Sequence, residues 1–164
     1  MPRYDASQAE LLVFTFKEGI LSAMAHDLKL RATTLELETT ETSVKLKVDA
    51  SSLRVVSPMK DGAENPSALP RMLYAEIEKN TAGDVLNAKK FPAITFESTA
   101  LSETQVIGKL TLHGTTRELT GKRTAKNTAE FSFDQRDFGI KPYSAMLGTL
   151  KVKPEVTIRV TIPG

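Results

Sequence analysis

Apolar and polar residues alternate along much of this chain, and this period of two constrains the fold more than any other feature. In the segment 44–49 valine and leucine alternate with lysine and aspartate, and in 156–162 valine and isoleucine alternate with threonine and arginine. The segments 106–112 and 131–133 alternate less regularly. A strand with one buried face and one solvated face requires such a pattern. The runs predict an all-β fold of about eight strands in a closed antiparallel β-barrel, which has no free edges.

The alternation changes parity once within a single apolar run. Leu28 and Leu30 lie on one parity. Leu35 and Leu37 lie on the other, so the register slips by one residue near positions 33–34. Such a slip predicts a β-bulge, which bends a strand and helps a sheet to close on itself.

One stretch of the chain has a helical period instead. Between residues 67 and 80 apolar side chains recur three and four positions apart, at Leu69, Met72, Leu73 and Ile77. This spacing predicts a short helical insertion. No repeat or linker divides the remainder, so the sequence predicts a single domain over residues 1–164.

The composition excludes several classes of site. The 164 residues contain no cysteine and only two histidines, which rules out a disulfide scaffold, a cysteine zinc site, a thiol nucleophile and a multi-histidine metal site. Lysine and arginine number 22 and the acids 20, so the net charge of +2 is too small to attract a polyanion from a distance. No nucleotide-binding loop, metalloprotease motif or hydrolase motif is present, and we expect no cofactor.

The densest basic patch lies within residues 117–126. Proteins that bind single-stranded nucleic acid interleave such charge with aromatic side chains on which bases stack. This stretch contains no aromatic residue, so we interpret the patch as a solvated hairpin and expect no nucleic-acid partner.

The sequence shows no apolar run that approaches the ~18–20 residues needed to span a bilayer. Residues 1–10 also lack the apolar segment of a secretory signal peptide. We therefore expect a cytoplasmic protein without a membrane span, or a periplasmic one if a leader has been removed.

His26 is the most suggestive candidate for chemistry. Extending the parity of Leu28 and Leu30 back by two residues puts His26 on the interior face, at one end of a strand. There the imidazole could hold a polar head group, act as a base, or simply bond a backbone carbonyl. The adjacent Asp27 points to the opposite face, which argues against a histidine–aspartate pair of the kind found in catalytic triads.

Phenylalanines share the parity of aliphatic residues on several predicted strands. They are Phe14, Phe16, Phe96, Phe131, Phe133 and Phe138. A barrel of eight strands has an interior that side chains just fill, or that holds one small ligand. The residues by themselves leave both possibilities open.

Five segments together resemble the YceI-like, polyisoprenoid-binding family. They are Phe-Pro-Ala-Ile-Thr-Phe-Glu-Ser at 91–98, Val-Ile-Gly-Lys-Leu-Thr-Leu-His-Gly at 106–114, Phe131, Arg-Asp-Phe-Gly-Ile at 136–140, and the alternating run 156–162. Their order, their spacing and the helical insertion before them all agree with the family, so the similarity covers nearly the whole chain.

This resemblance implies an extended, lipocalin-like antiparallel β-barrel that binds, sequesters or transports a long isoprenoid of the quinone or polyprenyl type, without catalysis. Similar proteins often form homodimers. The residues expected to contact an apolar ligand are Phe14, Phe16, Leu28, Leu30, Phe96, Leu110, Leu112, Phe131 and Phe133 in the channel, His26 at the head group and Met72 in the helical cover.

Two alternatives stay open at this point. A filled barrel that acts as a protein-interaction module predicts no cavity and an exposed apolar patch. An enzyme that acts on a lipid, with His26 as acid or base, predicts turnover that depends on this histidine, but the sequence offers no second catalytic group.

Overall fold

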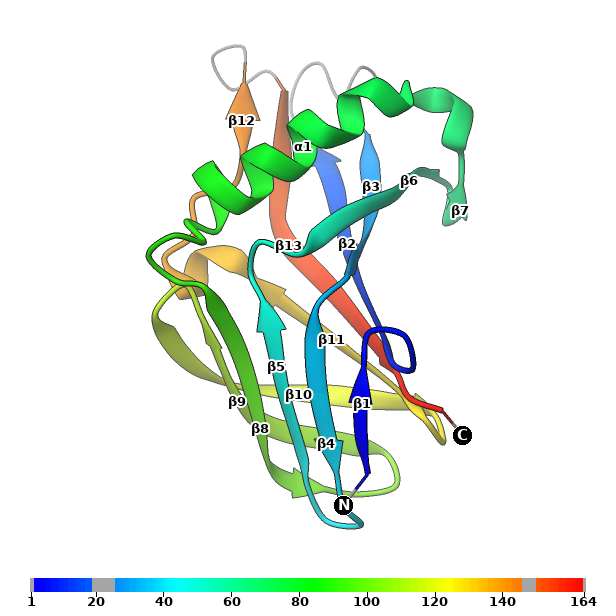
Figure 1. Ribbon diagram of the computed structural model, residues 1–164, viewed down its shortest axis with the longest axis vertical. Helices are drawn as coiled ribbons and strands as arrows, with labels where there is room; N and C mark the ends of the chain where they lie inside the picture. The colour runs from blue at the N-terminus through cyan, green and yellow to red at the C-terminus, as the bar shows by residue number, and fades with distance from the viewer. Residues whose placement is uncertain (1, 19–25, 146–149, 164) are drawn as a thin grey trace.

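A computed structural model describes residues 2–18, 26–145 and 150–163, and its strands form one antiparallel sheet curled into a half-barrel (Figure 1). The strands are β1 (Arg3–Asp5), β2 (Glu10–Glu18), β3 (Asp27–Ala32), β4 (Leu35–Thr39), β5 (Val44–Asp49), β6 (Leu53–Lys60), β7 (Ala63–Glu64), β8 (Ala93–Leu101), β9 (Gln105–Leu112), β10 (Thr115–Ala125), β11 (Thr128–Asp134), β12 (Ser144–Ala145) and β13 (Leu150–Thr161). Their order is β1-β4-β5-β8-β9-β10-β11-β13-β2-β3-β6-β7, with β12 beside β13. The all-β prediction is confirmed.

The predicted number of about eight strands is too low, because the described residues form thirteen. Residues 27–39 form two strands, β3 and β4, and residues 44–60 form two more, β5 and β6. β3 pairs with β2 and β6, whereas β4 pairs with β1 and β5. Three further strands, β1, β7 and β12, have only two or three residues, too few for a period to show in the sequence.

The bend between β3 and β4 lies where the parity slips. The backbone N–H and the hydroxyl of Thr33 both donate to the carbonyl of Ser52, at 3.0 and 2.7 Å. The N–H of Asp49 donates to the carbonyl of Thr34 at 3.1 Å. These bonds carry the pairing between residues 27–39 and 44–60 across the corner. One half of this bent hairpin, β4 and β5, lies near one end of the strand order, and the other half, β3 and β6, lies near the other end. The hairpin therefore connects the two ends and curls the sheet.

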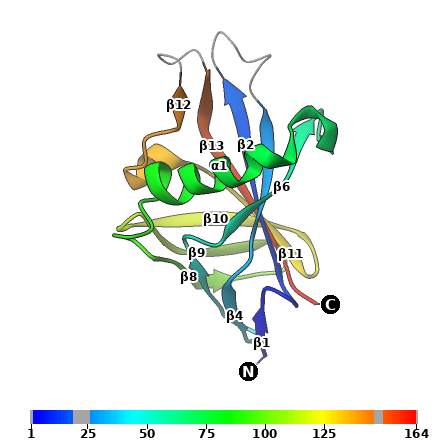
Figure 2. The same ribbon diagram turned by 45° about the horizontal axis from the view of Figure 1, so that its top comes forward.

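The predicted helical insertion is confirmed, although it is built from several short turns. It contains η1 (Pro66–Ala68), η2 (Arg71–Leu73), the α-helix α1 (Tyr74–Asn80) and the π-helical turn η3 (Thr81–Val85). The insertion lies across one end of the curled sheet, and the β4–β5 and β8–β9 hairpin turns lie at the opposite end (Figures 1 and 2). No helix among the described segments is long and apolar enough to cross a membrane.

A β-bulge in β6 makes a hydrogen bond to α1. Lys29 and Leu30 of β3 pair with Ser57 and Val55 of β6, so one residue of β6 is skipped. The N–H of Val55 instead donates to the carboxylate of Glu78 on α1, at 2.9 Å. A bulge leaves backbone groups without ladder partners, and here a helix side chain takes one of them.

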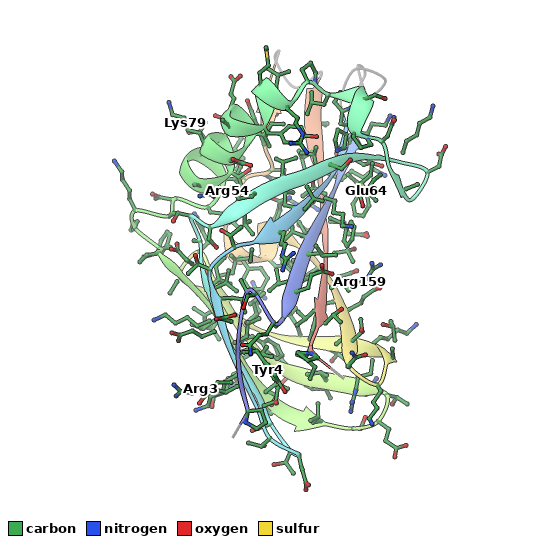
Figure 3. The ribbon with its side chains drawn as sticks, turned by 45° about the vertical axis from the view of Figure 1, so that its right-hand side comes forward. Arg3, Tyr4, Arg54, Glu64, Lys79 and Arg159 are labelled. Atoms are coloured by element: carbon green, nitrogen blue, oxygen red, sulfur yellow. The ribbon has the colours of Figure 1, made fainter. Side chains whose placement is uncertain are left out.

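The buried core lines the concave side of the sheet. Ala32, Leu35, Leu37 and Val48 are each at most 4% exposed and meet around the bent hairpin. On the convex side Arg159 of β13 faces outward and pairs with Glu130 of β11 at 3.0 Å (Figure 3). The sheet therefore has one apolar face and one charged face, as the alternation predicts.

Candidate functional site: an apolar cavity inside the curled sheet

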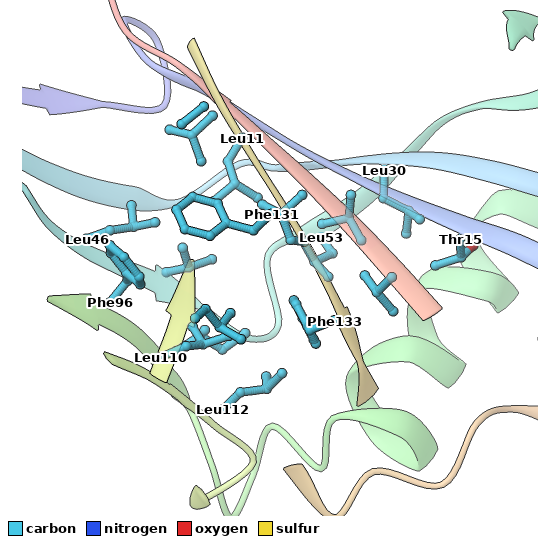
Figure 4. Close-up of a pocket in the computed structure, with 18 of the residues that line it drawn as sticks. Leu11, Thr15, Leu30, Leu46, Leu53, Phe96, Leu110, Leu112, Phe131 and Phe133 are labelled. Atoms are coloured by element: carbon cyan, nitrogen blue, oxygen red, sulfur yellow. The ribbon is translucent and has the colours of Figure 1, made fainter. Parts of the chain in front are cut away.

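The concave side of the sheet encloses a cavity of about 730 Å³. Side chains from β2, β3, β4, β5, β6, β8, β9, β10, β11 and β13 line it, and apolar side chains from distant strands face one another across the space (Figure 4). Its middle is walled by Leu11, Val13, Leu30, Leu46, Leu53, Phe96, Leu110, Leu112, Leu119, Phe131, Phe133, Ile158 and Val160. This size lies within the ~300–1,000 Å³ range of small-molecule sites, and such sites are mostly apolar.

Strand periodicity decides which side chains reach the cavity. On β2, Leu11, Val13 and Thr15 line it. Phe14 has the opposite parity, and the guanidinium of Arg159 lies 5.1 Å from its ring centroid on the convex face. Successive residues of a strand point to opposite faces, so β2 contributes every second residue.

Two glycines make room for two phenylalanine rings in the cavity wall. A Cβ on Gly121 of β10 would lie 2.5–2.7 Å from three ring atoms of Phe131. A Cβ on Gly108 of β9 would lie 2.5 Å from the ring of Phe96. The two rings meet edge to face, with centroids 5.2 Å apart. Glycine at these positions lets the rings lie flat against the backbone, and the space in front of them stays open.

The helical insertion closes one end of the cavity, which we call the helix end. Leu69, Leu73 and Ile77 line the cavity there, together with Glu76 and Asn80. The side-chain amide of Asn80 donates to the hydroxyl of Tyr143 at 3.4 Å. None of the residues in η1, η2, α1 or η3 is fully buried. The cover is thus apolar on its inner side and packed loosely against the sheet.

The opposite end, which we call the turn end, is bounded by hairpin turns. Thr39, Thr40 and Glu41 line it from the β4–β5 turn, and Arg123, Lys126, Asn127 and Thr128 line it from the β10–β11 hairpin. The guanidinium of Arg123 donates to the carbonyl of Ser102 at 2.8 Å and to that of Lys126 at 2.7 Å. Arg123 thereby joins the β8–β9 turn to the β10–β11 turn.

Charge is sparse in the cavity wall. Among the described residues only four charged side chains line it: Glu76 at the helix end and Glu41, Arg123 and Lys126 at the turn end. The described residues also contain no group of three or more His, Cys, Asp or Glu side chains that could hold a metal ion. The chemistry that this arrangement offers is burial of an apolar body with polar contacts at its ends.

Seven of the eleven residues expected to contact a ligand lie in the cavity wall. They are Leu28, Leu30, Phe96, Leu110, Leu112, Phe131 and Phe133. They come from β3, β8, β9 and β11, strands on which the alternation of the sequence identifies the inner face.

The structure corrects the placement of the other four. Phe14 and Phe16 lie on the β2 parity opposite to the cavity-lining residues, so neither is in the wall. His26 precedes β3 and does not reach the wall. Met72 belongs to the cover, but its side chain is 84% exposed and points to solvent, whereas its neighbour Leu73 lines the cavity.

The expectation that Asp27 does not orient His26 agrees with the geometry. The carboxylate of Asp27 accepts a hydrogen bond from the backbone N–H of Lys17 at 2.7 Å, across the end of the β2–β3 pair. Asp27 therefore ties two strands together.

Several wall residues were missed at the level of sequence. The polar residues of the turn end, such as Arg123, are not part of the apolar alternation that identifies the other wall residues. The basic stretch around Arg123 instead predicts a solvated hairpin. On β10, however, Arg123 has the same parity as Leu119 and Gly121, whose strand face turns to the cavity. That parity is the one sequence signal by which Arg123 could have been found.

Residues of the segments that resemble the YceI-like family form a cluster outside the cavity wall. The ring of His113 packs on Phe91 with centroids 4.7 Å apart, and its Nδ1 lies 3.3 Å from the carbonyl oxygen of Phe138. His113 and Gly114 both have positive φ, 55° and 76°, as a two-residue hairpin turn between right-twisted strands requires. These residues join the β9–β10 turn to η4 (Gln135–Phe138) and serve the fold.

Comparison with known proteins agrees with this architecture. The model of the YceI-like domain matches residues 4–163. The chain belongs to the YceI-like family. The resemblance identified from the sequence is therefore confirmed. A search of curated proteins found no significant match.

Three solved structures are similar to the chain at low sequence identity. BcnA from Burkholderia cenocepacia is 16% identical with a TM-score of 0.58, over 93% of each chain. A polyisoprenoid binding domain from Saccharophagus degradans, implicated in plant cell wall breakdown, is 12% identical with a TM-score of 0.47, over 94% of each chain. A mutant YCEI protein with a monobromobimane guest is 14% identical with a TM-score of 0.46, over 69% of this chain and 71% of that one. The likeness to BcnA supports the curled-sheet fold.

Proposed function

We propose that the protein binds one long-chain apolar molecule, an isoprenoid or a similar lipid, inside the cavity, and carries or sequesters it without chemical change. One observation carries this proposal. The concave face of the sheet holds a partly open space of about 730 Å³, and most of the side chains that line it are apolar. Membership of the YceI-like family supports the same function, since an enclosed isoprenoid is what the sequence resemblance implies.

The size of the cavity limits the ligand. At ~30 Å³ for each water-sized group, about two dozen non-hydrogen atoms fill the space. A chain of about four isoprene units therefore fits inside, and a longer chain would protrude from one end.

Energetics favour a chain of this length over a shorter one. Burial of one five-carbon isoprene unit contributes roughly 4 kcal/mol at ~0.8 kcal/mol per CH₂. Association costs ~4–15 kcal/mol in lost freedom. One or two units would barely offset that cost, whereas four units exceed it. The protein should therefore discriminate by chain length.

The proposal is tested by native mass spectrometry of protein purified without detergent, before and after incubation with geranylgeraniol and with the shorter geraniol. We expect an adduct of one lipid per chain, retained from the host cell or formed with geranylgeraniol, and a weaker or absent adduct with geraniol. A chain that stays bare at 18.0 kDa in every case would overturn the proposal.

The two alternatives receive less support. A filled barrel requires an interior closed by side chains, and the described residues leave a cavity instead. A reaction that uses His26 requires its imidazole beside the ligand, and His26 is not in the wall. Recovery of the lipid chemically unchanged after prolonged incubation would agree with binding without catalysis.

A further inference from the structure

We infer that the ligand carries an anionic head group, a carboxylate or a phosphate, which sits at the turn end while its apolar tail runs toward α1. This inference rests on the proposed function. The observation behind it is the uneven distribution of charge along the cavity. The helix end presents one charged side chain, that of Glu76, and the turn end presents two cations, Arg123 and Lys126, with one acid, Glu41.

Arg123 is the residue on which the assignment depends. It shares the inward parity of Leu119 and Gly121 on β10, so its side chain starts from the face that forms the cavity wall. Its position is half-buried, and two backbone carbonyls hold its guanidinium in place. An arginine fixed in this way is preorganised, and the planar guanidinium suits two-point contacts with carboxylate or phosphate oxygens.

Neither cation of the turn end is neutralised within the part of the chain that the structure describes. The ion pairs of the described residues join Arg3, Lys29, Lys45, Arg136 and Arg159 to carboxylates, and they include neither Arg123 nor Lys126. Lys126 is exposed and Arg123 is half-buried, so an anion at the mouth of the cavity can reach both cations.

The polar neighbours of the turn end fit the same head group. Thr39 brings a hydroxyl, which can donate to an anionic oxygen. The hydroxyl of Thr40 is already hydrogen-bonded to that of Ser43, at 2.8 Å. The side-chain amide of Asn127 is engaged with the carbonyl of Ile162 at 2.7 Å, and this bond holds the β10–β11 turn against the end of the chain. Behind these groups the wall becomes apolar at once, with Ala129 and Phe131. The head group would thus meet donors, and the first carbons of the tail would meet hydrocarbon.

The matched test compares ligands that differ only in their head group. Isothermal titration calorimetry is run at neutral pH with geranylgeranyl phosphate against geranylgeraniol, and with hexadecanoate against hexadecanol. We expect the anion of a pair to bind at least about tenfold more tightly than the alcohol. The two pairs separate a phosphate site from a carboxylate site. The preference should shrink with added salt, because screening weakens attraction between partly exposed charges.

Variants identify the groups responsible. The double substitution Arg123→Gln/Lys126→Gln should abolish the preference for the anion over the alcohol. Lys122→Gln is the control, because Lys122 is exposed on the opposite parity of the same strand. Arg123→Lys keeps the charge without the two-carbonyl bridge, and Lys126→Gln leaves that bridge intact. If the double variant is unfolded, these single variants show instead whether the preference for the anion depends on the two cations. Thermal melting checks that each single variant is folded.

Each outcome has a distinct meaning. Equal affinity for anion and alcohol in the unsubstituted protein would overturn the head-group assignment and leave the proposed function standing. A preference that survives the double substitution would overturn the assignment to the turn end. Failure of all four lipids to bind would instead overturn the proposed function.

Discussion

The two ends of the cavity are built in different ways. At the helix end a cover without a fully buried residue turns Leu69, Leu73 and Ile77 toward the interior. At the turn end the wall is the sheet itself: Arg123 joins two of its hairpin turns, and Asn127 binds the β10–β11 turn to Ile162. Segments with few buried contacts open at low free-energy cost, whereas sheet hairpins open only with the sheet. The helix end can therefore adjust to the length of a tail, while the turn end holds polar groups at fixed positions.

The largest effect should come from filling the space that glycine leaves near the turn end. Gly121→Ala would push the ring of Phe131 off the backbone and into the cavity, because the new Cβ would lie 2.5 Å from that ring. We expect a loss of stability of ~1–3 kcal/mol, typical of an overpacked site, together with a smaller cavity and weaker binding of geranylgeraniol. Urea denaturation and calorimetry measure the two effects.

Gly83→Ala in η3 is the control, since nothing lies within 4 Å of a Cβ there. It should leave lipid affinity unchanged and stability equal or slightly higher. If Gly121→Ala behaves like this control, the account of the phenylalanine wall is wrong.

A second effect should separate the inner from the outer side of the cover. Leu73→Asp places a carboxylate against the tail and should weaken lipid binding about tenfold, because a charge facing hydrocarbon is poorly solvated. Met72→Asp changes the adjacent but 84% exposed residue and should leave affinity unchanged. Fluorescent-lipid displacement compares the two. Equal losses in both variants would mean that the insertion does not present Leu73 to the ligand.

The smallest effect concerns neither end. Bonds from the side chain and the backbone N–H of Arg136 lower the pKa of the Asp134 carboxyl, which caps η4. A carboxyl with a lowered pKa contributes stability that is present above its unfolded pKa of ~3.9 and is lost as the pH falls through its folded pKa. Asp134→Asn should therefore melt slightly below the unsubstituted protein at neutral pH, and the gap should close as the medium becomes strongly acidic. A gap that widens on acidification would contradict this sign.

Sequence periodicity could predict most of the wall but not β2. On β3, β9 and β11 the inward side chains stand out by alternation. The run Leu11–Phe16 is apolar on both faces, so periodicity does not distinguish Val13 from Phe14 as the inward residue. In the structure Phe14 packs under the guanidinium of Arg159, a contact between residues far apart in sequence. Only the pairing of β2 with β13 decides this face.

The remaining misses have related causes. The sequence shows where the parity slips at residues 33–34, but not that the two halves of the strand join different neighbours. Arg123 and the turn residues 39–41 become a site only because three hairpins end at the same place. Which turns meet depends on the topology of the sheet, and local sequence patterns do not show it.

The most direct test of the account uses two adjacent residues of β13. Ile158 lines the cavity and pairs with Phe131 and Val13, and Thr157 lies on the opposite parity. Geranylgeraniol is titrated by calorimetry into the variants Ile158→Trp and Thr157→Trp, in a chain that contains no other tryptophan. The account predicts that Ile158→Trp lowers the affinity by at least about tenfold, since the indole occupies ligand space, while Thr157→Trp binds like the unsubstituted protein. Equal affinities of the two variants would contradict it, because the lipid would then lie somewhere other than the cavity.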